Sequence, residues 1–262
     1  MVTLVKLGGS LITDKTQRAT LRPVILRQLA LEVRQALDEN PQLELVLGHG
    51  SGSFGHFEAR EHDTINGVRT PAQWVGFARV GQIASELNYH VAHAFHEAGV
   101  PALRLQPSAS AIADNGVIKD MAMQPIFRAI EKGIIPLVYG DIAFDDTLGG
   151  TIISTETVFA HLVSRLSVKQ VFLLGEVDGV YDADGEVIPK ITADNFKTVR
   201  SVLGGSDGVD VTGGMLTKVQ DMLSLAMQAP YPNVYVLNGL VRGRLLKAVR
   251  GEDVIGTHIS QA

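Results

Sequence analysis

The chain of 262 residues contains no cysteine, which excludes disulfide bonds, a thiolate nucleophile and cysteine-ligated zinc. It also lacks an excess of positive charge: 23 lysines and arginines stand against 28 aspartates and glutamates, a formal net charge of −5. Without a long basic run, we expect no general affinity for nucleic acid or for an anionic membrane surface. Apolar runs stay well below the roughly 18 residues that a bilayer span requires, so no membrane partner is expected.

The N-terminus lacks the basic segment and apolar stretch that mark a secretory signal. Residues Met1–Lys6 instead lead directly into a strand pattern. Together with the absence of cysteine, this favours a cytoplasmic location. Hydrophobic residues make up 45% of the chain and charged residues 19%, as in ordinary globular proteins, and the length suits one large α/β domain.

Apolar runs of strand length alternate with helical patterns along the chain. We expect strands at Thr3–Leu7, Leu43–Leu47, Ala102–Leu105, Ile134–Tyr139, Val171–Leu174, Asn233–Leu237 and Gly256–Ile259, and a hairpin arm at Gly116–Lys119. We expect helices from Pro23 to Asn40, then over Pro71–Ala98, Met123–Glu131, Val158–Leu166, Phe196–Leu203, Met215–Gln228 and Leu240–Val249, with a loop at Phe144–Gly150. The alternation predicts a largely parallel sheet that helices cover on both faces.

Three glycine-rich turns lie next to expected helices: Gly8–Gly9–Ser10, the stretch Gly48–His56 and Gly213–Gly214. Glycine lets the backbone approach an anion closely, and N–H groups at a helix start can bind phosphate. Lysines stand at short spacing from two of these turns, namely Lys6, Lys15 and Lys218. Because ligands of parallel sheets collect at the carboxyl ends of strands, the turns predict phosphate-binding sites.

The stretch Gly50–Gly55 formally matches GxGxxG, so a dinucleotide-binding fold is one alternative. That fold needs an acidic residue at a strand end about 20 residues further on, whereas Thr70–Trp74 opens a helix. The sequence contains no GxxxxGK[ST] motif, so a Walker-type site is not predicted either.

Histidines offer a second kind of signal. His56 closes the central glycine-rich stretch, where an imidazole could donate to a phosphate oxygen. His90, His93 and His96 have ligand-like spacing, but a zinc site would also need supporting carboxylates on a shared face. We therefore predict no protein-bound metal site and assign His56 to a phosphate.

The order and spacing of four motifs resemble the amino-acid kinase superfamily, and most of all its isopentenyl phosphate kinases. The motifs are Lys6–Leu7–Gly8–Gly9–Ser10 with Lys15, His49–His56, Val177–Tyr181, and Asp210–Met215 with Lys218. The resemblance spans nearly the whole chain. His56 is its sharpest element, since relatives that act on carboxylates or UMP lack this histidine, whereas fosfomycin-type kinases share it.

This resemblance implies a three-layer αβα sandwich with a largely parallel open sheet, usually found as a homodimer. It implies a single domain over 1–262, with an acceptor-binding part at about 1–165 and a nucleotide-binding part at about 166–262. It further implies transfer of the ATP γ-phosphoryl group to isopentenyl phosphate, which gives isopentenyl diphosphate for isoprenoid biosynthesis. Mg²⁺ would be held mainly by the ATP phosphates.

The resemblance also assigns roles to residues. ATP contacts are expected from Lys6, Gly8, Gly9, Ser10, Lys15, Gly52, Glu176, Asp178, Gly214 and Lys218. The acceptor phosphate is expected at Ser51, Gly55, His56 and Thr155, and catalytic roles at Lys6, Lys15, His56, Glu156 and Lys218. Two positions depart from the family pattern. Glu156 replaces an aspartate that orients the two lysines, and Gly175–Glu176 replaces a Thr-Asp pair.

A phosphate monoester, with a second pKa of about 6, is mostly dianionic at neutral pH and can attack without a general base. Its apolar tail would lie along the long helix, where Phe77, Ile83 and Leu87 are candidates for the pocket wall, although core packing is the favoured role for each of them. Two alternatives stay open. One is a kinase for another small phosphate or phosphonate, fosfomycin included, and the other is a non-catalytic ATP-binding regulatory module.

Overall fold

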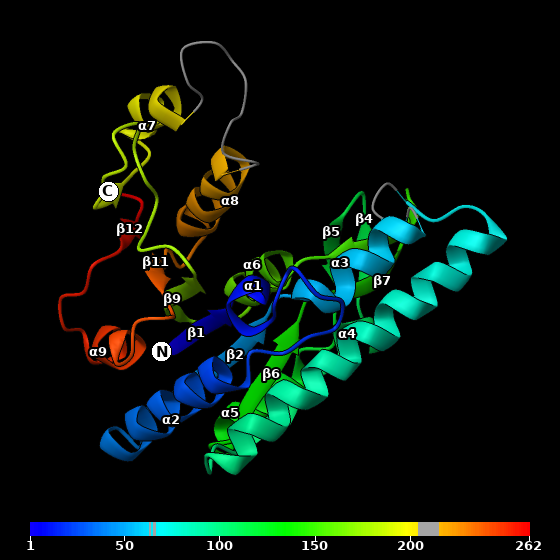
Figure 1. Ribbon diagram of the computed structural model, residues 1–262, viewed down its shortest axis with the longest axis horizontal. Coiled ribbons are helices and arrows are strands. Elements are labelled where there is room, and N and C mark those ends of the chain that lie inside the picture. The colour runs from blue at the N-terminus through cyan, green and yellow to red at the C-terminus, as the bar shows by residue number, and fades with distance from the viewer. Residues whose placement is uncertain (63, 65–66, 204–214) are drawn as a thin grey trace.

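The protein is built around one eight-stranded sheet (Figure 1). The computed structural model describes residues 1–62, 64, 67–203 and 215–262. The strands run in the order β10 (Lys190–Ile191), β12 (Thr257–Ile259), β11 (Asn233–Asn238), β9 (Val168–Gly175), β1 (Val2–Leu7), β2 (Leu45–His49), β6 (Ile135–Tyr139) and β3 (Ala102–Arg104). Every pairing is parallel except that of β11 with β12. The expected largely parallel sheet is therefore confirmed.

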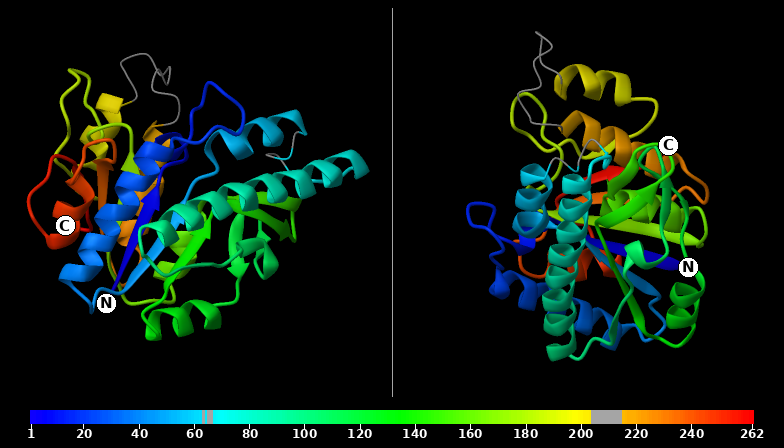
Figure 2. Two further views of the ribbon diagram at one scale, coloured as in Figure 1. Left: turned by 60° about the horizontal axis from the view of Figure 1, so that its bottom comes forward. Right: turned by 90° about the vertical axis from the view of Figure 1, so that its right-hand side faces the viewer.

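Helices cover both faces of this sheet (Figure 2). One face packs against α1 (Gly9–Ile12), α2 (Pro23–Glu39), α4 (Pro71–Glu97) and α9 (Arg244–Arg250). The other packs against α5 (Gln124–Glu131), α6 (Thr155–Val163), α7 (Phe196–Leu203) and α8 (Met215–Met227). The three-layer αβα sandwich expected from the sequence is confirmed. None of the described helices is both long and apolar enough to cross a membrane.

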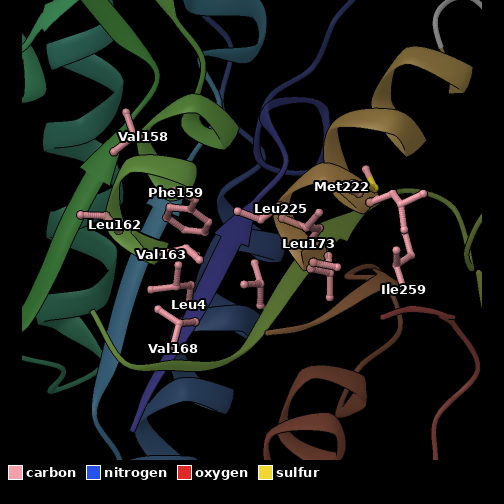
Figure 3. Packing of buried hydrophobic residues seen from close by; sticks show 14 of the residues in the cluster. Leu4, Val158, Phe159, Leu162, Val163, Val168, Leu173, Met222, Leu225 and Ile259 are labelled. Atoms are coloured by element: carbon pink, nitrogen blue, oxygen red, sulfur yellow. The ribbon is translucent and has the colours of Figure 1, made fainter. Parts of the chain in front are cut away.

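The central strands are mainly apolar because both of their faces are buried. Successive side chains of a strand point to opposite faces. On β1, Leu4 joins the core beneath α6 and α8, and the next residue, Val5, joins the core beneath α2 and α4. Figure 3 shows the first of these cores, in which Leu4 lies with Phe159 of α6 and Leu225 of α8. Continuous burial thus explains why the strand signals lack polar alternation.

A second, four-stranded sheet has the order β5 (Val117–Asp120), β4 (Ile112–Asp114), β7 (Asp141–Asp145) and β8 (Gly149–Ile153). The loop expected over 144–150 is wrong in extent, because Phe144 and Asp145 pair in β7 and Gly149 begins β8. Asp145 makes so short a connection possible. Its carboxylate accepts the N–H groups of Thr147 at 3.0 Å and Leu148 at 2.7 Å, and Gly149 takes a φ of +79°.

Asp145 also ties this hairpin to the neighbouring one, and its removal should destabilise the small sheet. The carboxylate accepts the N–H groups of Asn115 at 3.0 Å and Gly116 at 2.8 Å as well. Asp145→Ala leaves four backbone donors without their acceptor, so we expect a loss of about 2–4 kcal/mol in unfolding free energy at pH 7. Denaturant titration of the wild type and of Asp145→Ala measures this loss in unfolding free energy. Asp146→Ala, which removes only an exposed ion pair with Lys119, should cost less than about 1 kcal/mol.

The same clamp predicts a pH dependence. Burial acts to raise the pKa of Asp145, but the four backbone hydrogen bonds outweigh it and lower the pKa below its ordinary value. The stabilisation is therefore fully present above the ordinary carboxyl pKa and is lost as the pH falls through the folded-state pKa. The difference between wild type and Asp145→Ala should shrink in acid. A difference that stays constant from pH 7 down to pH 3 would contradict this account.

Three expected elements have other bounds in the structure. The Gly48–His56 stretch, expected as one loop, is split between the end of β2 and α3 (Gly52–Glu61). Helix α6 begins at Thr155 rather than Val158, since Ser154 caps it by accepting the N–H of Thr157 at 3.0 Å. Helix α9 begins at Arg244 rather than Leu240. These shifts place helix starts at the carboxyl edge of the sheet, where the site lies.

Candidate active site

The first two glycine-rich turns meet backbone to backbone. Strands β1 and β2 are neighbours, with Leu7 paired to His49, so both turns leave the sheet side by side. The N–H of Gly50 donates to the carbonyl of Leu7 at 3.0 Å. A Cβ on Gly9 would lie only 2.4 Å from the nitrogen of Gly52, so no larger residue fits there. The third turn, with Gly214, lies outside the described residues.

Thr13 fastens the two turns together. Its hydroxyl donates to the carbonyl of Gly9 at 2.7 Å and accepts the N–H of Ser53 at 2.9 Å, and the side chain is fully buried. Gly52 comes just before Ser53 and has a φ of +49°. A Cβ on Gly52 would lie 2.1 Å from the Thr13 hydroxyl oxygen. Nothing in the sequence pattern singles out Thr13, because its two partners are set only by the fold.

The structure brings Lys6 and Glu156 into an ion pair across the edge of the sheet. Lys6 is near the end of β1, and Glu156 is in the first turn of α6. The ammonium group of Lys6 donates to a carboxylate oxygen of Glu156, and both side chains are largely buried. Burial acts to raise the pKa of Glu156, but the charges of Lys6 and Lys218 and the hydrogen bond from Lys6 lower it. Glu156 thus lies in the field of both lysines, although Lys218, on α8, is itself exposed.

Lys15 and Ser10 flank the first glycine-rich turn. Lys15 is exposed in the turn that follows α1, and Ser10 is a half-buried residue of α1 itself. The amide of Gly8 donates to the carbonyl of Leu174 at 2.8 Å, which ties the turn to the neighbouring strand β9. This side of the site is therefore fixed by the sheet up to Gly8 and open to solvent at Lys15.

Both carboxylates expected near the nucleotide hold arginines that the sequence analysis missed. Glu176 forms an ion pair with Arg22, which comes just before α2. Asp178 pairs with Arg244 at the start of α9, and the hydrogen bond from Arg244 lowers the pKa of Asp178. These partners lie 154 and 66 residues apart in the chain, so no local pattern could have paired them.

A cavity of about 260 Å³ adjoins the second glycine-rich turn. Its lining comes from α3, α4 and the start of the small sheet: Ser51, Gly55, Ala59, Val80, Ala84, Gly140, Asp141 and Ile152. Two residues expected at the acceptor phosphate, Ser51 and Gly55, therefore line a cavity whose other walls are mainly apolar. Thr155 is not among the described lining residues. Its buried hydroxyl instead donates to the carbonyl of His49 at 2.6 Å.

The three candidates for the tail-pocket wall do not line this cavity. Among the described residues of α4, Val80 and Ala84 line this cavity, whereas Phe77, Ile83 and Leu87 do not. Phe77 packs with Trp74 and Phe144, at ring-centroid distances of 5.2 and 5.5 Å. Leu87 is fully buried in the core beneath α2. Periodicity identified the buried side of α4 but could not divide it between core and cavity.

Asp141 is the unexpected polar residue of the cavity. It is buried, and burial raises the pKa of its carboxyl group. Its oxygens accept the N–H groups of Ser108 at 3.0 Å and of Ile142 at 2.9 Å. The sequence did offer a signal, because only Gly140 separates Asp141 from the end of the expected strand Ile134–Tyr139, where ligands of parallel sheets collect.

A larger cavity, of about 430 Å³, lies between α6, α8 and β5. It shares Glu156 with the ion pair described above and also borders His161, Arg165 and Asp221. Partial burial, and next to it the negative charge of Glu156, raises the pKa of Asp221. Of the residues named here, only Glu156 was expected at a functional site.

His56 lies in α3, one turn beyond the start of the helix, and its side chain is outside the described part of the structure.

The described residues contain no group of three or more histidine, aspartate and glutamate side chains that could hold a metal ion. The carboxylate nearest the lysines, Glu156, is already engaged by Lys6.

Comparison with known proteins identifies the family of this arrangement. The amino acid kinase family profile matches residues 1–238. The isopentenyl phosphate kinase of Methanocaldococcus jannaschii is 30% identical, over 99% of this chain and 98% of its own, and that of Haloferax volcanii is 33% identical, over 95% and 98%. A solved isopentenyl phosphate kinase superposes with a TM-score of 0.84 at 30% identity, covering 99% of this chain and all of its own. The chain therefore belongs to the amino acid kinase family, and it is similar to isopentenyl phosphate kinases at 30% and 33% identity.

Proposed function

We propose that this protein transfers the γ-phosphoryl group of ATP to isopentenyl phosphate, giving isopentenyl diphosphate and ADP. The observation that carries the proposal is the juxtaposition of two kinds of site. Interlocked glycine-rich turns lie beside the Lys6–Glu156 pair, and the second turn leads directly into a mainly apolar cavity. A phosphate with a short hydrocarbon tail matches this combination.

The donor side uses the lysines and the first turn. Lys6 and Lys218 neutralise charge on the transferring phosphoryl group, Lys15 adds positive field, and amides of the 8–10 turn and of Gly52 bind phosphate oxygens. Glu156 orients Lys6, in the role that the family gives to an aspartate. Glu176 and Asp178, expected near the nucleotide, are both paired to arginines. In this proposal the two ion pairs shape the chain after β9, and the carboxylates are not free to bind the nucleotide.

The acceptor side uses the second turn and the cavity. Ser51, Gly55 and His56 hold the acceptor phosphate, while Ala59, Val80 and Ala84 give the tail an apolar wall. Burial of the five-carbon tail contributes on the order of 0.8 kcal/mol per CH₂. This lining favours an alkyl phosphate over a polar phosphonate such as fosfomycin.

The reaction needs alignment more than acid–base help. An oxygen of the acceptor dianion forms a bond to the γ-phosphorus in line with the bond to the β,γ-bridging oxygen, which breaks and leaves with ADP. No proton has to be removed from the nucleophile. Mg²⁺ would arrive on ATP, keep mostly phosphate and water ligands, and offset the negative charge of the triphosphate. The protein supplies position and positive charge.

Several features rest on the family resemblance alone and form part of the proposal. These are a homodimer, a role for Thr155 near the acceptor, and the division into an acceptor-binding part at about 1–165 and a nucleotide-binding part at about 166–262. A contribution of Gly214 to ATP binding belongs with them. A cytoplasmic location, expected from the N-terminus and the absence of cysteine, is also part of the proposal.

Replacement of His56 should separate acceptor use from ATP binding. We expect His56→Ala to lose most turnover, more than tenfold in kcat/KM for isopentenyl phosphate, because a donor to the acceptor phosphate is removed. ATP binding, followed by calorimetry, should change less than threefold. His93→Ala, an exposed histidine of α4, is the matched control. Near-normal steady-state kinetics for His56→Ala would remove His56 from the site.

An acceptor panel tests the proposed function. ADP release is measured with isopentenyl phosphate, fosfomycin, UMP and N-acetylglutamate at equal concentrations. We expect kcat/KM for isopentenyl phosphate to exceed the others at least a hundredfold. Preference for fosfomycin would establish the alternative kinase, and tight ATP binding without turnover on any acceptor would establish the regulatory module.

A further inference from the structure

His49 is a fully buried polar residue two positions before Ser51, which lines the cavity of about 260 Å³, called here the acceptor cavity. It ends β2, in register with Leu7 of β1 and Tyr139 of β6. Its backbone carbonyl accepts the hydroxyl of Thr155 at 2.6 Å and the N–H of Gly140 at 3.1 Å. One residue thus joins the second glycine-rich turn to the starts of α6 and of the small sheet.

The ring of His49 is held on three sides. Its Nδ1 lies 3.1 Å from the carbonyl oxygen of Gly50, and its Nε2 lies 3.0 Å from the side-chain nitrogen of Asn88 on α4. The ring of Tyr139 stacks on it, with centroids 5.5 Å apart and planes within 4°. A histidine placed in this way cannot turn without breaking a buried hydrogen bond.

These contacts select one protonation state. A carbonyl only accepts, so Nδ1 must carry the proton, and the amide nitrogen of Asn88 only donates, so Nε2 must be the acceptor. The ring is therefore neutral, in the Nδ1–H tautomer. Burial, together with the charge of Lys6, lowers the pKa of His49 to about 4 against the hydrogen bond to Gly50, in agreement with a neutral ring.

The hydrogen bond to Gly50 sets the direction of the next peptide group. The peptide between Gly50 and Ser51 is planar and trans, so its N–H is antiparallel to its carbonyl. Because the carbonyl faces the ring of His49, the N–H of Ser51 faces away from it. Ser51 lines the acceptor cavity, and in the described part of the chain no hydrogen bond uses this N–H.

We propose that His49 is a positioning residue for the acceptor: its neutral ring, held by Asn88, fixes the Gly50–Ser51 peptide so that the N–H of Ser51 is presented to the acceptor phosphate. The inference rests on the proposed function and deepens it. His49 does not touch the reacting atoms. It acts through the turn that does.

Two substitutions at the same position test this role. His49→Phe keeps a ring against Tyr139 but loses both hydrogen bonds, whereas His49→Asn can still donate from its amide to the carbonyl of Gly50. We expect KM for isopentenyl phosphate to rise about tenfold or more in His49→Phe, with KM for ATP changed less than threefold. His49→Asn should restore the acceptor KM to within about threefold of wild type. A merely structural role would not separate the two substrates.

The outcomes are distinct. Acceptor kinetics within twofold of wild type in folded His49→Phe, or His49→Asn as impaired as His49→Phe, would overturn the inference while the proposed function stands. If the wild-type protein does not phosphorylate isopentenyl phosphate, the proposed function is overturned, and this inference with it. Should His49→Phe fail to fold, ¹⁵N NMR of wild-type histidines decides the matter: we expect the Nδ1–H tautomer at pH 7, and an Nε2–H tautomer or a charged ring would contradict the proposal.

Discussion

Lys6→Met is expected to lower kcat at least a thousandfold while the protein stays folded. Methionine keeps the length of the side chain but removes the charge that we propose to face the transferring phosphoryl group. Such a group, acting in a largely buried site, supplies about 4 kcal/mol to the transition state, which corresponds to that factor. Lys6 is 15% exposed, so its charge is little screened by solvent. ADP release under saturating ATP and acceptor measures the effect, and thermal unfolding monitors the fold.

The control for Lys6→Met is Lys119→Met, which removes an exposed lysine from a surface ion pair with Asp146. Its kcat should stay within twofold of wild type. Because Lys6→Met leaves Glu156 without its partner, a moderate loss of stability is also expected. If the folded Lys6→Met protein kept kcat within tenfold of wild type, the assignment of Lys6 to phosphoryl transfer would be wrong.

Gly52→Ala is expected to force the first two glycine-rich turns apart and so to lower kcat/KM for both substrates at least a hundredfold. The new Cβ would lie 2.1 Å from the Thr13 hydroxyl oxygen and 2.6 Å from the carbonyl oxygen of Gly9. The second of these atoms is backbone, which cannot turn aside as a side chain can. The φ of +49° adds strain of about 1 kcal/mol or more. The two turns must therefore separate.

Gly185→Ala is the matched control for Gly52→Ala. Gly185 has a φ of +83°, but a Cβ there would meet nothing within 4 Å. It carries the same kind of backbone strain without a clash, so stability should fall slightly and activity should stay near wild type. Equal losses of activity in the two variants would show that strain alone, rather than contact between the turns, accounts for the effect.

Apolar runs and apolar periodicity in the sequence predicted the buried strands and the longest helix. Apolar runs located β1, β6 and β9 because buried parallel strands cannot alternate polar and apolar residues. The pattern over Pro71–Ala98 predicted α4 to within one residue, and proline at its start and glycine after its end mark both limits. The same reading failed at α3, because the glycines that shape its first turn also resemble a loop.

The contacts of the candidate site depended on partners far apart in the chain. Thr13 bridges Gly9 and Ser53, and the Lys6–Glu156 pair joins residues 150 positions apart. No periodicity specifies such pairs. The family resemblance placed Glu156 with Lys6, whereas Arg244 and the division of the α4 face between core and cavity required the fold itself.

The central claim, phosphoryl transfer to isopentenyl phosphate, is tested most directly by ³¹P NMR of a mixture of the protein, Mg²⁺-ATP and isopentenyl phosphate. We predict that the monophosphate resonance is consumed and that two coupled diphosphate resonances replace it, in step with the appearance of ADP. ADP formed together with inorganic phosphate, while the monophosphate resonance stays constant, would contradict the account.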